Sequence, residues 1–279
     1  DTNQLQKRQA KANVVDLKNA NKAVASLKNT PDEVLRIRPL TNGMVVVVWT
    51  DSALYNSEGK WLGEDPDVSG CDRRMLYSQA GALVGLMNAA DMAKDGDLPL
   101  SILDWRSRAT TRVVMSTFSA EAAAATEGFG MGVYMRALIC EVYHGCRDPT
   151  DWDESVMGVK LVVDCKSLYD NMAQVASVPE DKWTAIYMGA LRCGVSAGVG
   201  RSQDKAEKLW VPSRHQLADG LTKKGLGDNV RQIMRSGVTM LHELSEQELK
   251  RGRDEARLAN SSSAGEDLAL YSLRSANTQ

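Results

Sequence analysis

The first strongly apolar stretch of the chain, GMVVVVWTD at 43–51, is rich in β-branched residues and does not alternate between apolar and polar positions. Such a run is typical of a central strand that is covered on both faces, since each face of the sheet then needs apolar side chains. The stretches SQAGALVGLMNA at 78–89 and LSILDWRSR at 100–108 predict two further strands. Together the three stretches predict a three-stranded meander.

Two other segments in this half of the chain have patterns that are typical of helices. Apolar residues recur every three or four positions between 14 and 27, which predicts an amphipathic helix. From Ser119 to about Tyr143 the chain is rich in Ala and predicts a long helix, with Glu121 in its first turn. Glycines at 128, 130 and 132 weaken that helix by up to about 1 kcal/mol each relative to Ala, and they would allow it to pack closely on the sheet.

The second half of the chain alternates between strand and helix patterns. VKLVVDC at 159–165 and AEKLWVPS at 206–213 predict strands, and the segments 167–176 and 182–195 between them predict helices. A last helix is expected within RHQLADGLTKK at 214–224, and a frayed helix with a disordered end is expected beyond about residue 240. The order β-β-β-α-β-α-α-β-α implies an α/β fold with a mixed sheet and helices on both faces.

Composition and charge exclude few classes of function. The 279 residues are enough to bury one large core, and the net charge of -2 neither indicates nor excludes a polyanion partner, since a basic rim can exist under a near-neutral sum. No apolar run approaches the roughly 18 to 20 residues of a membrane span, so no membrane partner is expected. The five cysteines form no C-x-x-C pair and predict buried free thiols in an intracellular protein.

Four acids occupy equivalent positions in this element order. Asp51 ends the first strand, Glu121 opens the long helix, Asp164 ends the next strand and Asp219 opens the last helix. Such ends converge on one edge of an α/β layer, where ligands usually bind. Clustered carboxylates repel one another and are tolerated only with bound cations. Hard divalent ions prefer oxygen ligands, and Mg²⁺ is favoured among them because it keeps waters and also accepts phosphate oxygens. For each acid alone, a helix cap or dipole partner remains the alternative.

Several short sequence motifs follow one another along the chain, among them VWTDS at 48–52, STFSAEAAAATE at 116–127, VVDCKS at 162–167 and LWVPSRHQLADGLTKKGL at 209–226. In their common order, these motifs resemble the ribonuclease H domain of a Ty1/copia-type retrotransposon Pol polyprotein. The resemblance implies an RNase H-like five-stranded sheet, with three antiparallel strands and then parallel strands. It assigns Asp51, Glu121, Asp164 and Asp219 as the catalytic and metal-binding set for two Mg²⁺ ions, with Mn²⁺ as a substitute.

The same resemblance implies a function and its setting. The expected activity is metal-dependent hydrolysis of the RNA strand of RNA/DNA hybrids during reverse transcription, with the polymerase domain of the same polyprotein as a partner. The expected location is intracellular, in the cytoplasm (virus-like particle) or the nucleus. Residues 1–40 would be a connection helix and linker from the polymerase region, 41–228 the RNase H-like domain, and 229–279 a C-terminal helix and disordered tail.

Substrate contacts are expected from small polar and basic residues near the four acids. The candidates are Ser52, Ser119 and Ser167 for 2′-hydroxyls, Arg106, Arg108, Lys166 and Arg214 for phosphates, and His215, which is either a mobile site residue or a surface residue. Lys223 and Lys224 either reach a phosphate or are solvated. Lys182-Trp183 stands where the family usually has Lys-His. The alternative function is a catalytically inactive or domesticated RNase H-like module that binds nucleic acid or protein.

Overall fold

The computed structural model describes eleven parts of the chain, which all belong to one compact unit within residues 1–242. They are residues 12–30, 33–41, 43–54, 77–92, 94, 96–110, 112–145, 157–174, 177–195, 207–223 and 227–241. The frayed helix and disordered end expected beyond about residue 240 lie almost wholly outside the described residues, as does Lys224.

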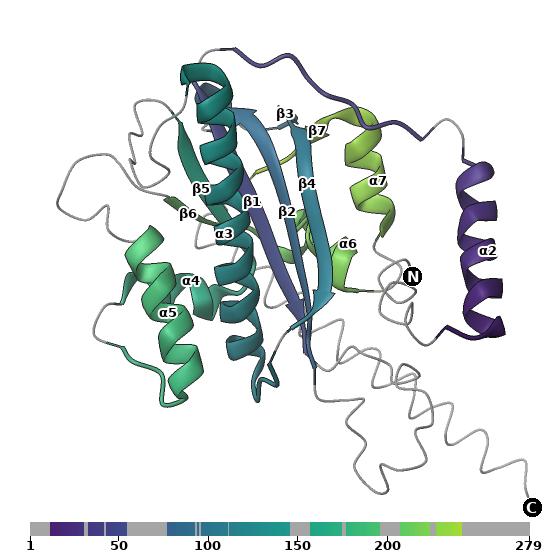
Figure 1. The fold of residues 1–279 in the computed structure, drawn as a ribbon. Coiled ribbons are helices and arrows are strands. Elements are labelled where there is room, and N and C mark those ends of the chain that lie inside the picture. Colours follow the sequence, from purple (N-terminus) through teal and green to yellow (C-terminus); the bar gives the residue numbers. More distant parts are fainter. Residues whose placement is uncertain are drawn as a thin grey trace, which may run out of the picture. The chain divides into compact units, whose positions relative to one another are not determined.

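The described strands form a mixed five-stranded sheet in the order β4-β2-β1-β5-β6 (Figure 1). Its strands are β1 (Met44–Ala53), β2 (Gln79–Asn88), β4 (Ser101–Ala109), β5 (Gly158–Val163) and β6 (Glu207–Trp210). β2 pairs antiparallel with both β1 and β4, whereas β5 runs parallel to both β1 and β6. The predicted meander followed by parallel strands is confirmed, and the chain has an RNase H-like α/β fold.

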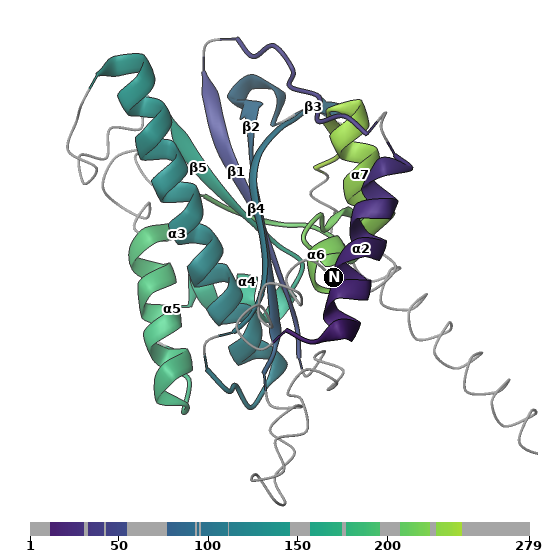
Figure 2. The same ribbon diagram turned by 45° about the vertical axis from the view of Figure 1, so that its right-hand side comes forward.

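Helices cover both faces of the sheet, as predicted (Figure 2). One face carries α3 (Thr117–His144), α4 (Lys166–Ala173) and α5 (Lys182–Val195), and the other carries α6 (Asp219–Thr222) and α7 (Gly227–Ser236). The predicted N-terminal helix is α2 (Val14–Lys28), which exposes Val14, Leu17 and Val24. No helix in the described part of the chain is both long and apolar enough to span a bilayer.

Two separate cores lie on the two faces because side chains alternate along β1. Val46 and Val48 belong to the core under α3, whereas Val45, Val47 and Trp49 belong to the core under α6 and α7. Eight consecutive residues of β1, from 45 to 52, are buried, which confirms the prediction of a doubly covered strand.

The C-terminal part of the fold contains elements that the sequence patterns did not predict. The expected last helix opens at Asp219 but lasts only one turn, and α7 follows it. A second, two-stranded sheet pairs β3 (Leu98–Pro99) with β7 (Val238–Thr239). Ile233 and Leu241 belong to the core under α6 and α7, so buried packing extends past residue 228.

Helix α3 begins earlier than predicted, and its close packing on the sheet is as predicted. Ser116 caps it, its side chain accepting from the backbone N–H of Ser119, so Glu121 lies in the second turn rather than the first. Gly128 and Gly132 face β1 so closely that an added Cβ would lie 2.2 Å from Thr50 Cγ2 and 2.3 Å from Val48 Cγ2, respectively. Glycine is therefore required where α3 lies on the central strand.

The prediction of buried free thiols holds only in part. Cys140 is buried and Cys165 is half-buried, but Cys193 is exposed on α5. All three are free cysteines, while Cys71 and Cys146 lie outside the described residues. The apolar neighbours of Cys193 in the sequence misled the prediction, because on a helix they occupy a different face.

The close packing of α3 gives a stability prediction with a control inside the same helix. Gly132→Ala should lower the free energy of unfolding by about 1–3 kcal/mol, because its Cβ has no space against Val48. Gly130→Ala should instead raise it by up to about 1 kcal/mol, since nothing lies within 4 Å of that Cβ and Ala is the better helix former. Urea denaturation measures both, and equal effects of the two variants would contradict this packing.

Candidate metal centre

The register of the parallel strands brings two of the four acids to the same level. Trp49 of β1 is opposite Val162 of β5, and continuing this register by two residues places Asp51 level with Asp164. Asp51 lies within β1, which continues to Ala53, rather than at its end, and its side chain is 2% exposed. Asp164 follows the last residue of β5, and its backbone carbonyl accepts a 2.9 Å hydrogen bond from Trp210 Nε1.

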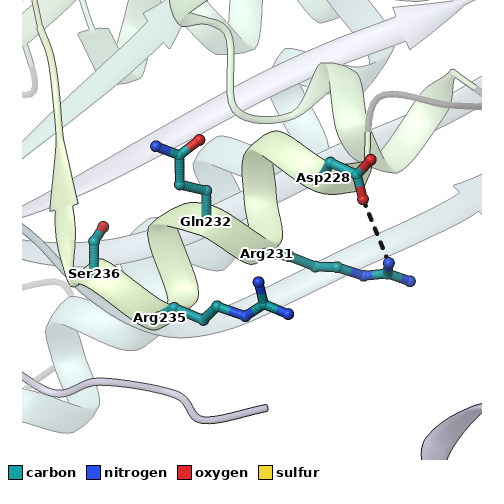
Figure 3. Close-up of a pocket in the computed structure, with 5 residues that line it drawn as sticks. All are labelled: Asp228, Arg231, Gln232, Arg235 and Ser236. Carbon is teal, nitrogen blue, oxygen red and sulfur yellow. Dashed lines mark hydrogen bonds and ion pairs between the residues drawn. The ribbon is translucent and has the colours of Figure 1, made fainter. Parts of the chain in front are cut away.

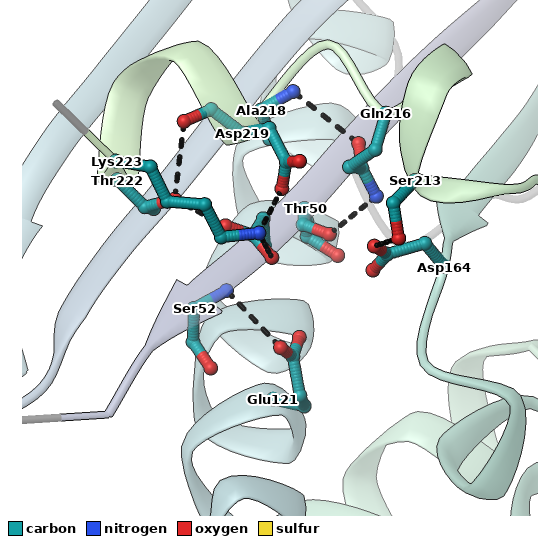
Figure 4. Close-up of polar contacts among 11 residues, drawn as sticks. Thr50, Ser52, Glu121, Asp164, Ser213, Gln216, Ala218, Asp219, Thr222 and Lys223 are labelled. Carbon is teal, nitrogen blue, oxygen red and sulfur yellow. Dashed lines mark hydrogen bonds and ion pairs between the residues drawn. The ribbon is translucent and has the colours of Figure 1, made fainter. Parts of the chain in front are cut away.

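Glu121 reaches this level from the opposite face of the sheet. Its Oε1 accepts a 3.3 Å hydrogen bond from the backbone N–H of Ser52, the residue that follows Asp51. One oxygen from each of Asp51, Glu121 and Asp164 lies within 4.8 Å of the others (Figure 4). The structure therefore brings three of the four predicted acids into one cluster, here called the three-acid cluster.

Asp219 approaches Asp51 on α6, and a glycine in β2 makes room for that helix. Gly81 is the β2 partner of Asp51, and an added Cβ there would lie 2.7 Å from Thr222 Cγ2 and 3.0 Å from the carbonyl oxygen of Ala218. Any larger residue at position 81 would push α6 away from β1. The position of the fourth acid thus depends on a small residue in β2, which lies much earlier in the chain.

Apolar burial and one buried amide fix the loop that leads into α6. Leu217 and Ala218 are buried and Leu221 packs against the same core, so these three residues hold the helix on the sheet. The Gln216 side chain is almost fully buried, and its Nε2 donates to the carbonyl oxygen of Thr50 at 2.9 Å. Gln216 therefore ties the start of α6 to the residue just before Asp51.

Asp219 does not join the three-acid cluster but forms an ion pair. Its Oδ1 lies 2.6 Å from Lys223 Nζ, and the same ammonium lies 3.8 Å from Asp51 Oδ1. The hydroxyl of Thr222 donates to Asp51 Oδ2. Lys223 was expected either to reach a phosphate or to be solvated, whereas here it is an internal cation between two of the acids.

Burial and mutual repulsion raise the pKa values of the clustered carboxyls. Burial, and then the negative charges of Asp51 and Asp164, raise the pKa of Glu121 from 4.5 to about 9. Burial also raises the pKa of Asp51 from 3.8 to about 7, although the Thr222 hydrogen bond opposes this shift. The pKa of Asp164 is raised by burial as well and is partly restored by Ser213, whose hydroxyl donates to its Oδ2 at 2.7 Å. Without a further cation, these groups resist simultaneous ionisation.

The residues present fit a hard divalent cation. All donors are carboxylate oxygens, the ligands that Mg²⁺ and Mn²⁺ prefer. Within the described chain, the buried Oε2 of Glu121 and the buried hydroxyl of Ser52 have no hydrogen-bond partner. A buried carboxylate oxygen without a partner is costly, and a bound cation would satisfy it.

Two of the expected phosphate contacts flank Asp164. Lys166 opens α4 two residues after Asp164, is exposed, and pairs with Asp170 at 2.9 Å. Arg214 is exposed and follows Ser213, the residue bonded to Asp164. Half-buried His215 comes next, and its Nε2 accepts from Arg214 Nε at 3.1 Å.

The remaining candidates have contacts of other kinds. Ser119 is buried, and its hydroxyl lies 2.6 Å from that of Thr184 on α5. Arg108 pairs with Glu127 of α3 at 2.8 Å, and Arg106 is exposed on β4. Ser167 lies 3.2 Å from Cys165 Sγ. Substrate contacts by these four residues stay predictions, and the contacts just described join none of the four to the acids.

Sequence reasoning missed the groups that orient the acids. Thr222 and Lys223 follow Asp219 by three and four residues, a spacing that puts them on its side of a helix, so this signal was readable in ADGLTK. Ser213 and Gln216 carry no comparable signal, because their contacts with Asp164 and Thr50 join residues far apart in the sequence.

A shallow pocket lies along α7 and involves none of the four acids (Figure 3). It is lined by Asp228, Arg231, Gln232, Arg235 and Ser236. Arg231 pairs with Asp228 at 3.4 Å, and Arg235 pairs with Glu33 of the segment before β1. Since both guanidinium groups already have carboxylate partners, this pocket gives no reason to expect an anion site.

Comparisons with known proteins found weak structural similarity to solved RNase H domains. No protein-family model and no curated protein matches the chain. The N-terminal RNase H domain of a Mycobacterium tuberculosis protein aligns at a TM-score of 0.37 and 15% identity, over 68% of this chain and 99% of that one. Ribonuclease H1 of Halobacterium salinarum aligns at a TM-score of 0.34 and 13% identity, over 66% of this chain and 98% of that one. A ribonuclease H1 isolated from compost aligns at a TM-score of 0.34 and 11% identity, over 67% of this chain and 98% of that one. Likenesses this weak carry no argument about activity.

The raised pKa values predict how stability depends on pH in the absence of metal. Glu121 and Asp51 bind protons more tightly in the folded chain than in the unfolded one, so the folded state loses stability as pH rises from about 4 to about 9. Thermal unfolding in EDTA should show this fall, and Glu121→Gln should flatten it. A difference of about 1 kcal/mol would appear as about 2–4 °C. An equally steep fall in the variant would contradict the burial of an ionisable Glu121.

Proposed function

We propose that this protein is a metal-dependent endonuclease that hydrolyses the RNA strand of RNA/DNA hybrids. The observation that carries the proposal is the three-acid cluster, in which the buried Oε2 of Glu121 has no hydrogen-bond partner among the described residues. Three acids brought together from two faces of the sheet, with Asp51 and Glu121 buried and Asp164 half-buried, serve no packing purpose and cost stability. They are explained by a bound cation and by the chemistry that a cation permits.

Asp51, Glu121, Asp164 and Asp219 would hold two Mg²⁺ ions, with Mn²⁺ as a substitute. When bound, the ions would supply the positive charge that activates a water and stabilises the leaving oxygen of a phosphodiester. The chain's own groups orient the carboxylates: Thr222 holds one oxygen of Asp51, and Ser213 holds one oxygen of Asp164. No protein nucleophile is needed.

Selection of an RNA strand would come from contacts with 2′-hydroxyls, and basic residues would bind phosphates. Ser52 is the candidate hydroxyl nearest to the acids along the chain, because it follows Asp51 and its backbone N–H donates to Glu121. Lys166 and Arg214 flank Asp164 and are exposed, so they are the strongest candidates for phosphate contacts. His215 lies beside Arg214 and would follow the substrate backbone with it.

The biological setting is proposed from the order of the sequence motifs alone. The chain would act in retrotransposon reverse transcription, inside the cell, beside a polymerase domain of the same polyprotein. In this arrangement α2 and the linker to residue 40 would connect to the polymerase, and residues 41–228 would form the catalytic domain. Burial of Ile233 and Leu241 indicates that residues up to 241 contribute to the stability of that domain.

A second candidate function is a module that binds nucleic acid or protein without catalysis. One observation favours it: Trp183 stands where the family usually has His, and the Arg112 guanidinium lies 3.5 Å from the centre of its ring. This stacked pair replaces a polar group near the start of α5 with an aromatic one. The two functions differ in whether the acids are needed.

Cleavage of a labelled RNA/DNA hybrid in Mg²⁺ tests the proposal directly. The wild type should cut the hybrid and neither RNA/RNA nor DNA/DNA, and Asp164→Asn should reduce the rate at least about a hundredfold while leaving the fold intact. Asp228→Asn, which neutralises an exposed acid on α7, is the matched control and should cut at the wild-type rate. A folded wild type that binds the hybrid without cutting it would establish the second candidate instead.

The phosphate contacts predict a change in salt dependence. Neutralising Lys166 or Arg214 should weaken hybrid binding and reduce the slope of log affinity against log salt by about one for each lost contact. Fluorescence anisotropy with a labelled hybrid measures the slope, and Arg231→Ala on α7 is a control of equal charge change. If each slope matches that of the wild type, the two residues do not bind phosphate.

A further inference from the structure

The four acids fall into two groups that have different neighbours. On one side, the oxygens of Asp51, Glu121 and Asp164 gather with no basic group bonded to Glu121 or Asp164 in the described chain. On the other side, Asp51 and Asp219 share the ammonium of Lys223, at 3.8 Å and 2.6 Å. Figure 4 shows the Lys223 ammonium beside Asp219, while no dashed line joins it to Asp164 or Glu121.

The position of Lys223 is one that a divalent cation shared by Asp51 and Asp219 would need. A cation bound to both carboxylates must lie between their oxygens, which is where Nζ lies. An ammonium and a divalent ion a few ångströms apart repel each other strongly. Lys223 and a cation bridging these two acids therefore exclude each other.

The side chain of Lys223 can move away from the two carboxylates without a change in the fold. It is 40% exposed, whereas those of Asp51 and Asp219 are 2% and 10% exposed, so its flexible stem has open water beside it. Its backbone is the extended residue that ends α6, so the side chain is not enclosed by a further helical turn. Rotation of the stem would release both carboxylates without moving the helix.

We propose that Lys223 is an internal counter-ion that occupies the Asp51–Asp219 side of the metal centre until a second divalent ion displaces it. The three-acid cluster would bind one ion with Lys223 in place, and the second ion would bind only when Lys223 has swung out. This inference refines the metal centre of the proposed function and rests on it. It makes the two ions unequal, with the second one weakened by the cost of displacing Lys223.

Titration calorimetry with Mn²⁺ on the full chain tests the proposal without an activity measurement. In Lys223→Met, which keeps the length of the stem, the second Mn²⁺ should bind about tenfold tighter or more than in the wild type, while the first binds much as before. Lys223→Arg keeps the charge and should behave as the wild type. Lys223→Gln is a second neutral variant, and Lys94→Met, on a surface lysine paired with Asp91, is the control for loss of charge alone.

Thermal unfolding gives a second readout on the same variants. Without metal, Lys223→Met should be less stable than the wild type, since two carboxylates lose their counter-ion, and saturating Mn²⁺ should raise its Tm by more than it raises that of the wild type. If the neutral variants bind the second ion as the wild type does or more weakly, Lys223 does not compete with metal and the proposal is overturned. If no variant and no wild type binds Mn²⁺, the metal centre itself is wrong. Normal metal binding without hybrid cleavage would contradict only the nuclease function.

Discussion

Double burial of β1 is the constraint on which the rest of this structure depends. A strand covered on both faces sends alternate side chains into two cores, so Val46 and Val48 hold α3 while Val45, Val47 and Trp49 hold α6 and α7. In the last residues before Ala53, the same alternation directs Asp51 toward α6 and the neighbouring Ser52 toward α3. The Ser52 backbone then binds Glu121, and Asp51 meets Thr222 and Lys223. The candidate metal centre therefore lies where two separately packed layers meet.

The four carboxylates repel one another electrostatically, and each of them receives a compensating contact from a neighbouring group. Thr222 donates to Asp51, Ser213 to Asp164, the Ser52 backbone to Glu121, and Lys223 forms an ion pair with Asp219. These contacts leave the pKa values of Asp51 and Glu121 well above their ordinary range, so the compensation is incomplete. A site that is left partly uncompensated in this way retains a favourable free energy for binding cations.

The strand and helix patterns predicted the sheet well because β1, β2 and β5 are buried runs whose composition follows directly from double coverage. They did not predict β3, β7 or α7, whose stability comes from tertiary packing, as in the burial of Ile233 against the core of β1. The closeness of Asp51, Glu121 and Asp164 could be predicted from strand ends and helix starts, but the separate pairing of Asp219 with a lysine could not. That pairing depends on Lys223. The four-residue spacing between Asp219 and Lys223 indicates that the two lie on the same side of a helix, but it does not indicate that Lys223 also contacts Asp51.

The short length of α6 connects these points. Because the helix is a single turn, the first residue (Asp219) and the residue that ends it (Lys223) are neighbours along its axis, and both meet the end of β1. Gly81 permits this approach, since a side chain there would collide with Thr222. A glycine in β2, a buried acid in β1 and a lysine after α6 are thus parts of one arrangement. It lets the chain fold with four acids close together, and, if the proposed metal centre binds two ions, it would set the order in which they are taken up.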